Sequence, residues 1–150
     1  MTNLALLALT HLSLLAAGPT YAEAYDSSVE TGSPLVVLVG ADWCPGCQAM
    51  KGSVIPSVRR NGGLDGANFV VVDTDAEGPL ARRLMRGTSI PQLIMYYRTA
   101  DGWKRTSLTG RQSEEAVAWF VRQGVEAVAA SPVPSQAAAA QPAQVSQSGR

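Results

Sequence analysis

The sequence predicts an α/β fold, a three-layer sandwich in which helices cover both faces of a mixed central sheet. Two short continuous apolar runs, at residues 35–39 and 69–72, are typical of strands buried on both faces. A helical pattern lies between these runs, so they form a parallel pair joined by a right-handed crossover. Two further strands, at 93–97 and 103–108, flank an Asp-Gly turn and predict an antiparallel hairpin.

Helices are expected in the gaps between these strands. After Cys47, three apolar residues recur at helical spacing as one buried stripe, within which Pro56 should kink or end the helix. A short helix is expected over 79–85 and a short lead-in helix over 23–33. Ser113 is a good N-cap for a last helix. The stripe of the first helix is Met50, Val54 and Val58, and the last helix should bury Val117, Phe120, Val121, Val125 and Val128.

Composition leaves room for one domain and argues against a nucleic-acid partner. The chain has 150 residues, of which 46% are hydrophobic and 16% charged, and its formal net charge is zero. Its longest basic runs are pairs, Arg59-Arg60 and Arg82-Arg83, which are typical of solvated helix faces. We therefore expect a monomer that does not bind nucleic acid.

The two ends differ from the middle in composition. Residues 1–22 lack charged side chains, and their apolar run is too short to span a bilayer, which predicts a signal peptide cleaved after Ala22. The segment lacks Lys and Arg, so an uncleaved membrane anchor is the alternative. The protein should thus be exported, to the periplasm in a Gram-negative bacterium. The folded domain is expected at 23–130, followed by a disordered Ala/Gln/Pro/Ser tail at 131–150.

The chain's two cysteines lie three residues apart where the first buried strand meets a helix. Cys44 falls at the helix N-cap and Pro45 at the first helical position, where its missing N–H is not needed. The unpaired N–H groups and the positive end of the helix then favour the Cys44 thiolate, by about 0.3 to 1 kcal/mol. Cys47 lies almost one turn further on, where it can close a small disulfide ring. This pattern predicts reversible thiol–disulfide exchange.

Three other interpretations of the cysteine pair stay open on residues alone. A purely structural disulfide is disfavoured because so small a ring constrains little of the chain. A zinc site needs four ligands, and the one histidine, His11, lies in the predicted signal peptide. Covalent haem attachment calls for histidine directly after the second cysteine, where this chain has Gln48. We therefore expect neither a metal nor a cofactor.

The run Ala41-Asp42-Trp43-Cys44-Pro45-Gly46-Cys47 closely resembles the active-site segment of the thioredoxin superfamily. Thr88-Ser89-Ile90-Pro91-Gln92 looks like that family's second signature, a loop with a cis proline, and Gly110 follows the last strand as the family's glycine does. The resemblance covers about residues 25 to 128 and implies a thioredoxin fold. Without it, Pro91 would be only a proline leading into a strand, because few X–Pro bonds are cis.

The resemblance also implies a role for each matching residue. Cys44 would attack the substrate disulfide and Cys47 would resolve the mixed disulfide, while Trp43 shields the pair. Pro91 would lie cis beside Cys44, leaving the backbone of Ile90 free to pair with an extended substrate segment. Pro45 and Gly46 would tune the redox poise, because their order decides which backbone N–H groups reach the sulfur.

Two departures from the family pattern bear on the second step of exchange. Leu38 stands where the family often has a buried aspartate that moves the resolving thiol's proton, and Val71 stands where a partnering lysine is expected. We therefore expect slower resolution, or help from water or the substrate. The charge of Asp42, beside the motif, would raise the Cys44 pKa slightly if it acted on the sulfur, but we interpret Asp42 as a solvated loop residue.

Two hypotheses of function follow. The first is an exported oxidoreductase that exchanges disulfides with protein thiols, as a reductant supplied by a membrane electron carrier. The second is a binding module that holds a client at the Pro91 groove without redox turnover.

Overall fold

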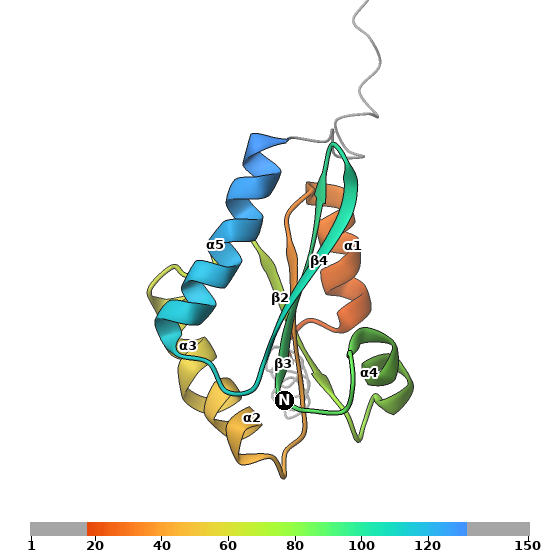
Figure 1. Ribbon diagram of the computed structural model, residues 1–150, viewed down its shortest axis with the longest axis vertical. Helices are drawn as coiled ribbons and strands as arrows, with labels where there is room; N and C mark the ends of the chain where they lie inside the picture. The colour runs from red at the N-terminus through yellow and green to blue at the C-terminus, as the bar shows by residue number, and fades with distance from the viewer. Residues whose placement is uncertain (1–17, 132–150) are drawn as a thin grey trace, which may run out of the picture.

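The computed structural model describes residues 18–131, which form a four-stranded sheet in the order β2-β1-β3-β4 (Figure 1). The central strand β1 is parallel to β2 and antiparallel to β3, and β3 forms a hairpin with β4. The mixed sheet, its parallel crossover and the hairpin are as predicted. The strands are β1 (Leu35–Gly40), β2 (Asn68–Asp73), β3 (Gln92–Thr99) and β4 (Gly102–Thr109).

Helices cover both faces of this sheet, which makes the three-layer sandwich (Figure 1). One core layer joins the even-numbered residues of β1, such as Leu38, to the active-site helix and α5, and the other joins its odd-numbered residues to α1 and α4. Side chains alternate between the faces of a strand, so a continuous apolar run serves both layers. The helical segments are α1 (Tyr21–Thr31), α2 (Pro45–Ala49), η2 (Met50–Val54), α3 (Ile55–Arg60), α4 (Gly78–Leu84) and α5 (Glu114–Ala130).

The expectation that the second apolar run is buried on both faces is wrong. β2 is an edge strand, and Val71 in its middle is 38% exposed. β1 and β3 are the two inner strands instead, and all six residues of β1 are buried. The apolar pattern of β2 is like that of β1, but only the strand order decides which of the two is central.

Pro56 does not end the first helix, which continues to Arg60. The chain widens into the π-helical turn η2 just before it, where the N–H of Ile55 donates to the carbonyl of Met50, five residues back. A proline ring clashes with the carbonyl four residues earlier and offers no N–H to it. The wider turn relieves that conflict, so the helix is locally deformed and not broken.

The last helix starts as predicted, with Ser113 as N-cap accepting from the N–H of Ala116 at 3.2 Å. Its C-terminal half is less buried than predicted, because Val125 and Val128 are only half-buried. The buried residue there is Gly124, where a Cβ atom would lie 2.4 Å from the sulfur of Met95. A glycine has no side chain, so the pattern of apolar residues in the sequence does not predict that Gly124 is buried.

The lead-in helix α1 begins two residues before the predicted one. Thr20 caps it: its hydroxyl accepts from the N–H of Glu23 at 3.3 Å, while the Glu23 carboxylate accepts from the N–H of Thr20 at 2.7 Å. The predicted cleavage after Ala22 would remove this cap, and its position stays a prediction. Most of the predicted signal peptide and the tail after residue 131 lie outside the described residues.

Removal of the Thr20 hydroxyl should destabilise the domain. We expect Thr20→Ala to lower the free energy of unfolding by about 1 kcal/mol, because a backbone N–H at the helix start loses its acceptor. Urea denaturation of the full chain measures it, with Thr88→Ala, at an exposed loop position, as the matched control. Equal midpoints for the wild type and Thr20→Ala would show that the cap contributes nothing.

Candidate active site

The cysteine pair lies where the central strand passes into the active-site helix. β1 ends at Gly40, a short loop follows, and Cys44 is the N-cap of α2 with extended backbone angles. Pro45 occupies the first turn, as predicted. The end of the most buried strand thus carries the pair, so the surrounding sheet holds the cysteines in position.

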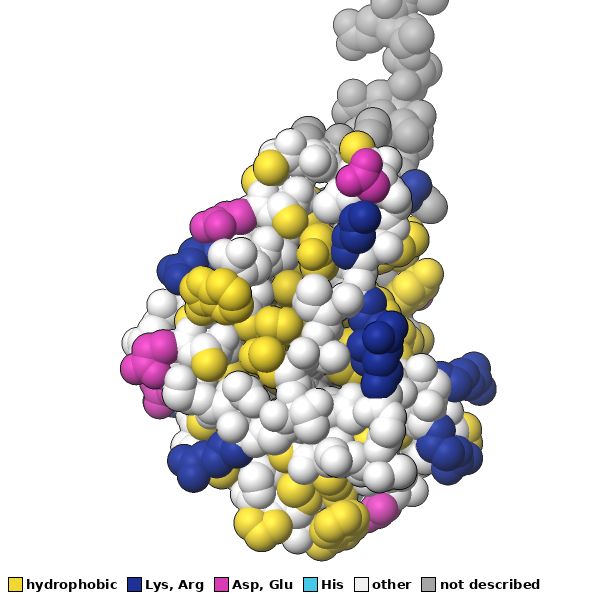
Figure 2. Space-filling model, viewed as in Figure 1, with side chains coloured by type: hydrophobic (Ala, Val, Ile, Leu, Met, Phe, Trp, Pro, Cys, Tyr) yellow, Lys and Arg dark blue, Asp and Glu magenta, His cyan; other side chains and the backbone are white. Residues whose placement is uncertain are grey.

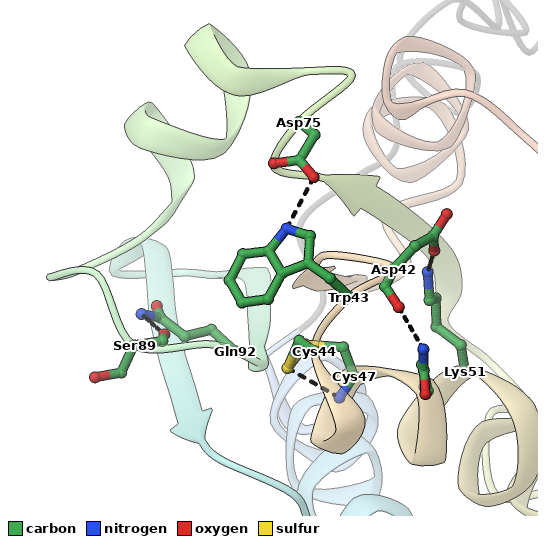
Figure 3. The surroundings of a disulfide bond; sticks show 9 residues. Asp42, Trp43, Cys44, Cys47, Lys51, Asp75, Ser89 and Gln92 are labelled. Carbon is green, nitrogen blue, oxygen red and sulfur yellow. Dashed lines mark hydrogen bonds and ion pairs between the residues drawn. A yellow bond between two sulfur atoms is a disulfide. The ribbon is translucent and has the colours of Figure 1, made fainter.

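Cys44 and Cys47 are joined by a disulfide, with their Cα atoms 5.2 Å apart. The N–H of Cys47 also points at the Cys44 sulfur, 3.3 Å away (Figure 3). Cys47 is fully buried, whereas Cys44 keeps 7% exposure. Only Cys44 is therefore open to an incoming molecule, and an N–H donor at the helix start is in place to stabilise its thiolate.

Two glycines allow the close packing around the pair. A Cβ atom on Gly40 would lie 2.8 Å from the Cys47 sulfur, so a side chain there would collide with the inner cysteine. A Cβ atom on Gly46 would lie 3.3 Å from the ring of Pro91. The resemblance implies a part in redox tuning for Gly46, whereas the sequence predicts no role for Gly40. Glycine is common at the end of an apolar run, so the sequence does not indicate that Gly40 packs against Cys47.

The peptide bond between Ile90 and Pro91 is cis, the isomer that the resemblance implies. Pro91 lies against the active-site helix through Gly46, and its carbonyl accepts from the N–H of Gly110 at 2.8 Å. Ile90 packs partly buried against the cluster that holds both cysteines. Loop and cysteines, far apart in sequence, thus form one site.

Gln92, which sequence analysis missed, holds this loop. It is buried, and its amide nitrogen donates to the carbonyls of Arg86 and Ser89, each at 2.9 Å. Figure 3 shows Gln92 beside Ser89. Its amide oxygen accepts from the N–H of Arg86 at 3.2 Å. A buried polar side chain that satisfies three backbone groups gives the loop one defined path.

Trp43 is 68% exposed and stands beside the cysteines (Figure 3). Its indole N–H donates to the carboxylate of Asp75 at 2.9 Å, which fixes the ring. Asp75 is held in turn by Asp73, whose carboxylate accepts from the N–H groups of Ala76 and Asp75. These hydrogen bonds lower the pKa of Asp73 below its ordinary value, with a smaller contribution from the charge of Lys51.

Asp42 is an exposed loop residue, as expected, and its carboxylate also forms an ion pair with Lys51 (Figure 3). Leu38 and Val71 are partners in the register of β1 and β2, so both departures from the family pattern meet at one place in the sheet. Leu38 is buried, and the residue opposite it on β2 is the apolar Val71, so neither position carries an ionisable side chain.

Across residues 18–131, no group of three or more His, Cys, Asp or Glu side chains could hold a metal ion.

Residues 16–97 match the family model described as Thioredoxin-like, more than half of the chain. A thioredoxin from Thermus thermophilus is similar in structure, with 27% identity, a TM-score of 0.55, and coverage of 69% of this chain and 82% of that one. A Trichomonas vaginalis thioredoxin aligns with 21% identity, a TM-score of 0.56, and 71% and 93% coverage. The solved structure of a DsbH oxidoreductase aligns with 19% identity and a TM-score of 0.56, and the alignment covers 73% of this chain and 84% of that one. A comparison with curated proteins found no significant match.

The contact at Gly40 predicts an unusual sensitivity to one methyl group. We expect Gly40→Ala to cost about 1 to 3 kcal/mol of stability, because the new Cβ atom overlaps the Cys47 sulfur. The matched control is Gly52→Ala in η2, where nothing lies within 4 Å of the added atom. Urea denaturation of both variants in the oxidised form measures the difference. Similar midpoints for the two variants would contradict the contact.

The matching region includes the whole cysteine-bearing segment, the parallel strand pair and most of β3. The bonded pair of Cys44 and Cys47 supports thiol–disulfide redox chemistry, the chemistry that an oxidoreductase with this centre performs. On the family model, the fold and this centre, the chain belongs to the thioredoxin-like family.

Proposed function

We propose that this protein reduces disulfide bonds of protein substrates outside the cytoplasm. The observation that carries the proposal is the bonded pair of unequal exposure, in which Cys44 reaches the surface and Cys47 is enclosed. A protein that only bound its partner would need neither this difference in exposure between the two cysteines nor a helix N–H directed at the sulfur of Cys44.

The reaction begins from the reduced pair. The Cys44 thiolate attacks one sulfur of a substrate disulfide, breaks that S–S bond and releases one substrate thiolate, which takes up a proton. The Cys47 thiol then gives up its proton and attacks the Cys44 sulfur, which expels the second substrate thiolate. The products are two substrate thiols and the Cys44–Cys47 disulfide. Two electrons and two protons from a dithiol donor restore the reduced pair.

The reducing direction draws its support from the kind of structure that the chain resembles. The Thermus thermophilus protein, at 27% identity, is a thioredoxin, and thioredoxins have low reduction potentials of about −270 mV. A reductant outside the cytoplasm needs a source of electrons there. We assign that role to a membrane electron carrier with a dithiol of its own.

The proposed location comes from the N-terminal sequence. The uncharged apolar segment within residues 1–22 is the pattern of a signal peptide or an anchor. Over the range 18–131, the structure contains no helix long and apolar enough to cross a membrane. N-terminal sequencing of protein recovered from the periplasm tests export, and recovery of the unprocessed chain only from the cytosol would contradict it.

Substitution of the inner cysteine should trap substrates. Cys47→Ser leaves Cys44 able to attack but removes the thiol that releases the product, so covalent complexes should accumulate. Non-reducing gels and mass spectrometry detect them, with Cys44→Ser as the matched control that should trap none. A variant with alanine at both positions that keeps full partner affinity, together with no trapped species, would identify a holding module instead.

The reduction potential of the pair decides the direction. We expect a value close to about −270 mV, below the glutathione couple, because a reductant must give up electrons to its substrates. Equilibration with glutathione buffers, followed by alkylation and mass measurement, determines it. A potential above about −180 mV, in the range of disulfide isomerases and oxidants, would overturn the reducing assignment.

A further inference from the structure

The two edges of the sheet differ in how they are protected. Edge strands present unpaired backbone N–H and C=O groups, and proteins commonly shield them with charged side chains. β4, at one edge, carries Lys104 and Arg105, and Lys and Arg side chains line this edge in Figure 2. β2, at the other edge, has the uncharged run 69–72 in its middle. Within the described range, β2 is therefore the edge that is open to pairing.

A groove of about 600 Å³ runs beside β2, between that strand and the outer side of η2 and α3. Its size is in the range of ligand-binding clefts. Apolar side chains form much of its wall, three cationic side chains also line it, and none of its lining residues is acidic. The apolar residues are Pro19, Ile55, Pro56, Phe69, Val70 and Val71, the cationic ones are Lys51, Arg59 and Arg60, and Gly18 completes the lining.

The cationic residues of the groove are not equally engaged. Lys51, at the end nearer the cysteines, already pairs with Asp42. Arg59 lies over the ring of Phe69, 5.5 Å from its centre, and both Arg59 and Arg60 are exposed. Neither arginine forms an ion pair with another residue of the described chain. The far end of the groove therefore offers two guanidinium groups to an anionic ligand.

The spacing of these charges suits an extended peptide. Lys51 and Arg59 are eight residues apart on the helix, which corresponds to about 12 Å at the helical rise. In a β-strand, side chains four residues apart point to the same side and are separated by about 13 Å. A strand bound along β2 can therefore place one carboxylate at the arginines and a second at Lys51, whose ammonium group has three N–H donors and already shares one with Asp42. The side chain midway between them would lie over the apolar wall.

We propose that β2 and its groove bind an extended, acidic segment of a partner protein, which adds to the sheet as a fifth strand. Backbone pairing with β2 supplies part of the affinity, and the basic groove selects acidic residues four apart with an apolar residue between them. A second copy of this chain fits poorly, because pairing through its own β2 would bring the cations of its η2 and α3 close to the same groove. The surface is separate from the cysteine pair, so this inference is independent of the redox chemistry.

The probe is a fluorescein-labelled peptide, Thr-Glu-Thr-Val-Thr-Glu-Thr, titrated into the full chain and followed by fluorescence anisotropy. We expect saturable binding that weakens as salt is added. The double variant Arg59→Glu, Arg60→Glu should reduce affinity by about tenfold or more. Its matched control is Arg82→Glu, Arg83→Glu, the adjacent exposed pair on α4. Reduction of a small-molecule disulfide should be unchanged in both variants.

Three results would overturn this proposal. One is equal affinity for a peptide in which both glutamates are lysine, and another is an equal effect of the two double variants. The third is failure of the peptide to bind the full chain at all, whether because another part of the chain covers β2 or because two copies pair there. Size-exclusion chromatography with light scattering on the full chain identifies the paired copies. None of these results bears on Cys47→Ser trapping, so the two proposals fail separately.

Discussion

The contact between Gly40 and Cys47 is the constraint on which the rest of the site depends. A sulfur can lie against the end of the central strand only because that position has no side chain. The helix can then begin within a few residues of the strand and direct an N–H group at Cys44. A second glycine, Gly46, lets the helix approach Pro91 in the same way. The close packing around the two cysteines thus depends on two residues that have no side chain, Gly40 and Gly46.

Side-chain hydrogen bonds to the backbone hold the loops around this centre. Gln92 fixes the loop that carries the cis proline, and Asp73 fixes the turn that presents Asp75 to Trp43. Such bonds are local and satisfied, so the loops keep one conformation without adding to the hydrophobic core. The cysteines of the site therefore lie on a strand–helix junction, and each surrounding loop is held by its own hydrogen bonds. A functional site needs such support, because the reacting groups must keep the same geometry in every cycle.

The environment of Cys47 bears on the second step of the proposed reaction. The thiol is enclosed, and the strand pair beneath the site has Leu38 and Val71 in register where the family often has an aspartate and a lysine. Burial in apolar surroundings disfavours the thiolate. In the proposed reaction there is no internal carboxylate at that position, so we expect the Cys47 proton to pass to water or to the substrate. The exposed pair of Asp42 and Lys51 lies outside this enclosure.

Local signals in the sequence determined the elements and the identity of the redox pair. Buried strands, helix caps and a cysteine pair at a strand–helix junction each leave a pattern within a few residues, so the fold class, Ser113 and Cys44 were predictable. Tertiary structure alone decided that β2 is an edge, that Gly124 and not Val125 is buried, and that Gln92 and Asp75 belong to the site. These depend on which distant segments meet, and strand order and side-chain contact across a sheet have no counterpart in local periodicity.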